Sequence, residues 1–198
     1  MSEPAYQHMT EEEYLASEEL SPVKREYVGG YVYALHGDTL AQAGASSRHG
    51  EITLNIAGTL QPLARKKRCK VYASDMRVNC TTPVGKRVYY YPDVVATCEK
   101  VDGKAASISA PSLIVEVLSP RTRHTDLTDK IWAYTSLSSL QTYLIVEADT
   151  RLVRAIERQP DDSWSERELS DTGKIELPYL GATLTLDDVY DGVFQSDI

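Results

Sequence analysis

The strongest constraint on the fold is the short apolar run Leu113–Leu118, which is interrupted only by Glu116. Pro111 precedes the run and Ser119-Pro120 ends it. A run of this length and composition is typical of a strand in the middle of a sheet, covered on both faces. An ionised carboxylate is costly there unless it is paired, hydrogen-bonded or bound to a metal. Glu116 therefore requires a partner, which in the simplest case is a buried ion pair or solvent at a strand end.

The rest of the chain predicts an α/β (α+β) domain, with a mixed β-sheet flanked by helices and preceded by an N-terminal helix and hairpin. Thr10 and Glu13 have capping-box spacing, and Gly29-Gly30 separates two β-prone runs. Apolar residues at helical spacing predict a long helix from Ser46 to Arg65, which Pro62 is expected to kink or shorten. Further strands are expected at 71–73, 76–78, 88–91, 94–97, 142–146, 152–156, 164–169 and 174–177. Further helices are expected from Thr122 or Thr125 to Tyr134 and at 186–190.

Composition and length favour one globular domain over residues 1–198, because the chain is 42% hydrophobic and 25% charged. No apolar run approaches the roughly 20 residues that span a bilayer. The acidic N-terminus does not have the form of a secretory signal, so a cytoplasmic protein without a membrane anchor is expected. Cys69, Cys80 and Cys98 are odd in number and form no Cys-x-x-Cys pair, which predicts buried, reduced thiols.

The net charge of -8 opposes long-range attraction to a polyanion. Any contact with nucleic acid must therefore be made by local basic patches. The densest candidate is Arg65-Lys66-Lys67-Arg68 with Lys70. Such a run is more often a solvated helix end.

Asp93, Glu116 and Lys130 form the candidate site. Each has an ordinary explanation, because Pro92-Asp93 is a common turn and Lys130 has the spacing for an exposed helical pair with Asp126. Taken together, they place two carboxylates on neighbouring strands and a lysine on the following helix. Carboxylates about 4 Å apart repel by roughly 4 kcal/mol at an effective dielectric near 20, and a divalent cation reverses that repulsion. Mg²⁺ prefers such oxygen ligands together with waters and a phosphate, which is the chemistry of phosphodiester hydrolysis.

At these residues the chain resembles the PD-(D/E)xK, or restriction-endonuclease-like, superfamily, and within it the bacterial Uma-type branch. The resemblance covers nearly the whole chain. The segments that carry it are 25–30, 74–78, 91–95, 115–120 and 180–184, with His49-Gly50, Asn55, Asp126, Lys130 and Tyr134.

The resemblance implies that Asp93 and Glu116 are metal ligands for Mg²⁺ or Mn²⁺. The superfamily lysine is expected two positions after Glu116, where this chain has Leu118. Lys130, on the following helix, is therefore expected to take the basic role. Glu26 resembles the acidic residue that the N-terminal part contributes to the catalytic site.

Asp75, His49 and His124 are secondary candidates, each with a simpler explanation. Glu26 has the alternative of a surface pair with Lys24 or Arg25, and Asp75 of a turn residue. His49 and His124 are more often surface or hydrogen-bonded helix residues than ligands.

The function implied is that of a metal-dependent endonuclease that hydrolyses DNA phosphodiester bonds, acting as a homodimer when it cuts both strands. The alternative is a catalytically inactive nuclease fold that serves as a DNA-binding or assembly module. The acidic net charge and the missing strand lysine favour that alternative. A hydrolase acting on another phosphoester would use the same carboxylates.

Overall fold

The computed structural model describes residues 7–35, 46–119 and 123–194, without the side chains of Arg123 and His124. The expected helix start at Thr122 and the side chain of His124 therefore lie outside the described residues. The helices are α1 (Glu11–Glu18), α2 (Ser47–Lys66), α3 (Arg123–Leu127), α4 (Asp129–Tyr134) and α5 (Leu186–Val189). The strands are β1 (Gln7–His8), β2 (Arg25–Val28), β3 (Tyr31–Ala34), β4 (Lys70–Ala73), β5 (Arg77–Thr81), β6 (Arg87–Tyr90), β7 (Val94–Thr97), β8 (Ser107–Ile108), β9 (Leu113–Val117), β10 (Thr142–Val146), β11 (Leu152–Arg158), β12 (Trp164–Ser170), β13 (Lys174–Leu177) and β14 (Ala182–Thr185).

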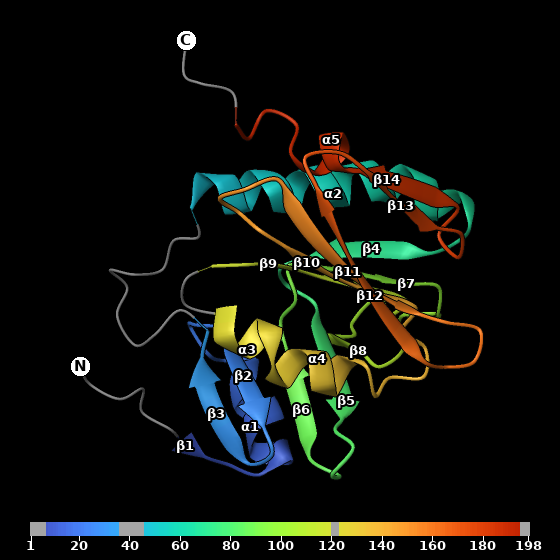
Figure 1. Ribbon diagram of the computed structural model, residues 1–198. Coiled ribbons are helices and arrows are strands. Elements are labelled where there is room, and N and C mark those ends of the chain that lie inside the picture. Colours follow the sequence, from blue (N-terminus) through green and yellow to red (C-terminus); the bar gives the residue numbers. More distant parts are fainter. Residues whose placement is uncertain (1–6, 36–45, 120–122, 195–198) are drawn as a thin grey trace.

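The predicted mixed α+β class is confirmed, but the strands divide between two six-stranded sheets and a two-stranded one rather than forming a single sheet (Figure 1). The first sheet has the order β1-β3-β2-β6-β5-β8, and the second β12-β11-β10-β9-β7-β4. In the second sheet β9 lies between β7, which is antiparallel to it, and β10, which is parallel. All five residues of β9 are buried, as its apolar composition predicts.

Helix α2 covers one face of the second sheet, above it in Figure 1. Its apolar residues Ile52, Ile56 and Leu60 are fully buried and share one core cluster with β7 and β9. Of the two expected effects of Pro62, shortening of the helix is wrong, because α2 continues past it to Lys66, and a kink stays a prediction. None of the helices in the described ranges is long and apolar enough to cross a membrane.

The opposite face of the second sheet packs against α4, which Figure 1 shows beside the strands of the first sheet. The single helix expected up to Tyr134 is divided into α3 and α4. The break falls at Thr128, whose φ of -129° and ψ of -80° are not helical. As a result α4 is a separate short helix that buries Lys130, Ala133 and Tyr134.

The N-terminal helix and hairpin form as predicted. Thr10 caps α1 with both hydrogen bonds of a capping box to Glu13. β2 pairs with β3 around Gly29 and Gly30, which have φ of 57° and 104° and so need residues that tolerate a positive φ. The hairpin is joined to the first sheet through β6.

The prediction of reduced thiols is wrong for two of the three cysteines, because Cys69 and Cys98 form a disulfide; Cys69 is buried as predicted, whereas Cys98 is exposed. The register explains the pairing: Lys70 lies opposite Thr97 in the β4–β7 ladder, so Cys69 and Cys98 face each other one position beyond it. Cys80 is a free, buried thiol, as predicted for all three.

Candidate active site

Glu116 is the buried charge of β9, with 3% of its surface exposed. Two side chains of α4 compensate it. The ammonium of Lys130 lies 2.9 Å from Glu116 Oε1 and donates a hydrogen bond to it. The Tyr134 hydroxyl donates a second hydrogen bond to the same oxygen, over 3.0 Å.

Asp93 immediately precedes β7, on the strand beside Glu116. The register Val94–Val115 in the β7–β9 ladder places Asp93 one position further, opposite Glu116. Asp93 Oδ2 accepts a hydrogen bond of 2.7 Å from the backbone N–H of Val117, which fixes the carboxylate at the end of β9. Its other oxygen lies 3.2 Å from Nε2 of His49, in the first turn of α2.

Lys130 is held among three carboxylates. Its Nζ lies 2.9 Å from Asp126 Oδ1 and 3.5 Å from Glu26 Oε1, in addition to the contact with Glu116. Asp126 is 1% exposed and Lys130 is 2% exposed. The explanation of these two residues as an exposed helical pair is therefore wrong, because Asp126 on α3 and Lys130 on α4 are both buried.

Glu26 joins this cluster from β2. It is buried, and its Oε1 accepts a hydrogen bond of 3.2 Å from the backbone N–H of Tyr91. The alternative of a surface pair for Glu26 is wrong, because Lys24 pairs with Asp75 and Arg25 pairs with Glu18. Asp75 is exposed and lies outside the cluster.

The electrostatic balance of the cluster is negative, since one lysine faces three carboxylates. Burial raises the pKa of Glu116 well above its usual value, Lys130 opposes that effect, and Asp126 and Asp93 add to it. Burial likewise raises the pKa of Glu26 against the opposing charge of Lys130. Burial disfavours the charged form of Lys130, but Glu116, Glu26 and Asp126 outweigh it and hold the pKa of Lys130 well above its usual value. The cluster is therefore suited to take up further positive charge.

The chemistry of the donors fits a hydrated divalent cation. Neither carboxylate oxygen of Asp126 accepts a hydrogen bond from the described residues, although Oδ1 lies within ion-pair distance of Lys130. In the described part of the chain, no group of three or more His, Cys, Asp or Glu side chains is placed so that it could hold a metal ion by itself. Mg²⁺ is commonly held by one or two carboxylates, with waters and substrate oxygens completing the shell. Asp93 and Glu116 match that incomplete type of site.

Asp126 and Tyr134 have a larger part in the geometry than the sequence indicated. With Lys130 they follow each other at four-residue steps, which in a continuous helix puts side chains on one face. That spacing was the available signal for Tyr134. His49 and Asp93 are far apart in sequence, and no local pattern predicts their contact.

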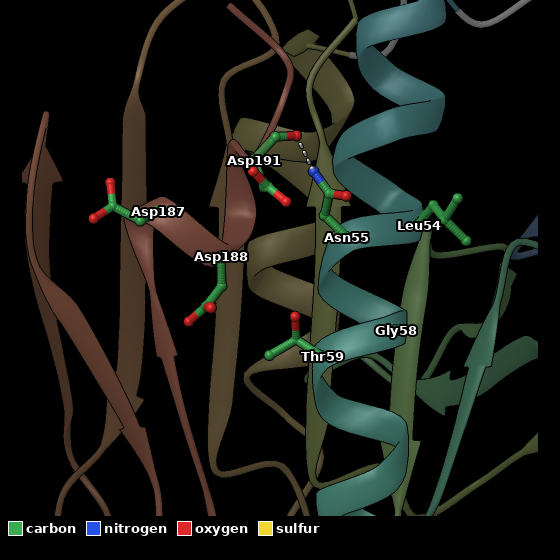
Figure 2. A pocket seen from close by; sticks show the side chains of 7 residues that line it. All are labelled: Leu54, Asn55, Gly58, Thr59, Asp187, Asp188 and Asp191. Carbon is green, nitrogen blue, oxygen red and sulfur yellow. Dashed lines mark hydrogen bonds between the residues drawn. The ribbon is translucent and has the colours of Figure 1, made fainter.

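A separate hollow of about 480 Å³ lies between α2 and α5 (Figure 2). It shares no lining residue with the cluster described above. Asn55 spans it by donating hydrogen bonds to the backbone carbonyls of Val189 and Asp191. Among its acidic residues, Asp188 completes the capping box of α5 with the N-cap Thr185, and Asp187 pairs with Arg151. These two carboxylates therefore serve the structure of α5.

Comparisons with known proteins agree with this architecture. A crystal structure described as "a putative nuclease belonging to DUF820 from Anabaena variabilis" superposes with a TM-score of 0.67, covering 91% of this chain and 98% of that one at 13% identity. The Synechocystis sp. protein slr1290 is 29% identical over 186 residues, 93% of each chain. The Synechocystis protein sll1609 is 28% identical over 176 residues, 87% of this chain and 94% of its own. The sequence pattern of the Uma2 family, described as "Putative restriction endonuclease", matches residues 11–187, and the chain belongs to that family.

Proposed function

We propose that this protein is an endonuclease that hydrolyses DNA phosphodiester bonds with Mg²⁺ or Mn²⁺. One observation carries the proposal: the Val117 N–H of β9 holds the Asp93 carboxylate just before β7, and Lys130 donates to Glu116 on β9, although the strand lysine of the superfamily is replaced by Leu118. The fold and the membership of the Uma2 family support the same reaction class.

Asp93 and Glu116 would hold the metal ion, which supplies a polarised water and neutralises charge on the phosphate when it is bound. The Val117 N–H and His49 keep the Asp93 carboxylate in place. Lys130, fixed by Glu116 and Asp126, would orient the attacking water and oppose the negative charge that develops on the phosphate oxygens. Glu26 would act through Lys130, because its carboxylate is the third negative partner of the ammonium, 3.5 Å away.

The test is cleavage of supercoiled plasmid by purified Asp93→Asn and Glu116→Gln. Each variant keeps the side-chain volume but removes a metal-binding charge, so we expect cleavage to fall by about 10²–10³-fold. Asp75→Asn is the matched control, because it makes the same change on an exposed carboxylate outside the cluster and should cleave as the wild type does. Wild-type rates in both site variants would refute the site.

A catalytically inactive nuclease fold is the second candidate. One observation favours it: Lys130 and Glu116 are almost fully buried and already satisfy each other. Calorimetric titration with Mn²⁺ separates the two candidates. An active site gives saturable binding that Asp93→Asn and Glu116→Gln both abolish, whereas an inactive module gives none.

The substrate and the oligomeric state are part of the proposal. Parallel assays on plasmid, single-stranded DNA and RNA test DNA against other phosphoesters. Cutting both strands of a duplex is simplest for a two-fold homodimer, in which each copy cuts one strand.

A further inference from the structure

The basic run after α2 is more than a charged helix end. Arg65, Lys66, Lys67, Arg68 and Lys70 are all exposed. Arg65, Arg68 and Lys70 line a hollow of about 540 Å³ beside Tyr72 of the edge strand β4. We call Arg65, Arg68, Lys70 and this hollow the basic surface.

Among the described residues, no carboxylate forms an ion pair with any of the five cations of the run. Lys70 Nζ donates a hydrogen bond of 3.4 Å to the backbone carbonyl of Val101, which carries no charge. Other cations of the chain are paired, such as Lys24 with Asp75 at 2.6 Å and Arg167 with Glu157 at 2.7 Å. In a chain of net charge -8, an unpaired cluster of this density is suited to a negatively charged partner.

The backbone at Arg68 differs from what the end of a helix usually favours. Helix α2 ends in a Schellman motif, in which the Cys69 N–H donates to the Ala64 carbonyl and the Arg68 N–H to the Arg65 carbonyl. Arg68 has a φ of 61°, in the position where glycine is favoured. A non-glycine residue in this conformation carries modest backbone strain, so Arg68 stands at a point where the backbone favours glycine.

Two ordinary explanations cover only part of the surface. Cations stabilise the last turn of a helix through its dipole, which accounts for Arg65 and Lys66. A lysine on an edge strand discourages pairing with another sheet, which accounts for Lys70. Neither accounts for Arg68. The Cys69–Cys98 disulfide also ties the run to the end of β7, so its cations are held in place.

We propose that the basic surface binds the phosphate backbone of DNA, apart from the catalytic carboxylates. That the anionic partner is DNA follows from the proposed function. That the partner is anionic follows from the charge of the basic surface alone. His49 and Arg65 lie 16 residues apart on α2, about 24 Å at 1.5 Å per residue. The basic surface is therefore separate from the end of α2 that contacts Asp93.

The test is fluorescence anisotropy of a labelled duplex of about 30 base pairs, in EDTA, over roughly 50–200 mM salt. Arg65→Gln/Arg68→Gln removes two phosphate contacts, so we expect the slope of log K against log salt to fall by about 2 and the affinity to drop uniformly for unrelated sequences. The matched control is Lys86→Gln/Lys104→Gln, which makes the same charge change at two exposed lysines outside the surface. It should keep the wild-type slope.

A third variant separates charge from folding. Arg68→Gly relieves the positive φ, so it should melt at a higher temperature than the wild type and still bind DNA more weakly. Unchanged binding in Arg65→Gln/Arg68→Gln, or an equal loss in the control pair, would overturn the inference. EDTA prevents metal-dependent cleavage, so the anisotropy assay measures binding alone. If the protein binds DNA through this surface but does not cleave it when Mg²⁺ or Mn²⁺ is present, the proposed function is overturned and this inference is not.

Discussion

Lys130 occupies the most demanding position in the molecule, because a fully buried ammonium is stable only with close negative partners. Glu116, Asp126 and Glu26 provide them at 2.9, 2.9 and 3.5 Å. The ring of Tyr90 lies 5.5 Å from the same nitrogen and adds a cation–π contact. The buried ammonium and the buried carboxylates therefore stabilise each other, and removing either leaves an uncompensated buried charge.

We expect Lys130→Met to lower the free energy of unfolding by roughly 3–5 kcal/mol, because it leaves three buried carboxylates without their cation. Urea denaturation at neutral pH measures the loss. Lys174→Met is the matched control, since Lys174 pairs with Glu176 on the surface and should change stability by less than about 1 kcal/mol. Similar values for both variants would contradict the structural importance of the buried lysine.

Tyr134→Phe tests the second partner of Glu116 at almost constant volume. Losing the hydroxyl should cost about 1–3 kcal/mol and should also reduce metal-dependent cleavage, because Glu116 loses one of the two bonds that orient it. Tyr143→Phe is the control, since its hydroxyl donates instead to the Asp126 backbone carbonyl. If cleavage falls equally in variants of equal stability, Tyr134 has no orienting role.

Among the elements, the β4–β7 ladder lies along α2. Asp93, at one end of the ladder, contacts His49 in the first turn of α2, and the Cys69–Cys98 disulfide at the other end lies just after the last turn of α2. The disulfide holds the start of β4 against the sheet after the turn that ends α2. The disulfide thus cross-links the start of the edge strand β4 to the end of its neighbour β7.

Cys69→Ser/Cys98→Ser should lower the free energy of unfolding by roughly 2–4 kcal/mol without reductant, because the cross-link closes a loop over a separation of 29 residues. Reductant should destabilise the wild type by a similar amount and leave the double variant unchanged. Thiol titration in denaturant should find one thiol, Cys80. In the native state burial raises the pKa of Cys80 to about 12, so it should not react near pH 8. Three reactive thiols in the unfolded, unreduced protein would contradict the cross-link.

At the scale of the whole molecule, the two large sheets meet around the acidic cluster. Glu26 comes from the first sheet, and Asp93 and Glu116 belong to the second, so the site depends on how the sheets are packed. The raised pKa of Glu26 makes part of the stability depend on pH. A carboxyl whose pKa is higher in the folded state than in the unfolded state stabilises most at low pH, and this contribution is lost as pH rises through the folded pKa.

Glu26→Gln, which carries no charge at any pH, should therefore flatten the dependence of unfolding free energy on pH above about 4.5, the ordinary value for Glu. Compared with the wild type, the variant should gain stability as the pH increases. Chemical denaturation at several pH values measures this difference, with the exposed Glu12→Gln as control. A constant difference between variant and wild type across the range would contradict the raised pKa.

The sequence by itself determined the local features of this protein. The apolar period of α2, the capping box of α1, the Gly29-Gly30 hairpin and the buried strand with its odd glutamate are set by neighbours a few residues apart, and all of them are present in the structure. The Uma-type resemblance also named the residues that the structure brings together, although their catalytic roles stay a prediction.

Only the tertiary structure decided which distant groups meet. The division into two sheets, the Cys69–Cys98 cross-link, the contact of His49 with Asp93 and that of Glu26 with Lys130 all join segments separated by many residues. Such contacts depend on strand register and on which face of a helix is buried, and local sequence constrains neither of them uniquely. The same packing buried Asp126 with Lys130 instead of exposing them, and so turned an ordinary helical pair into part of the candidate active site.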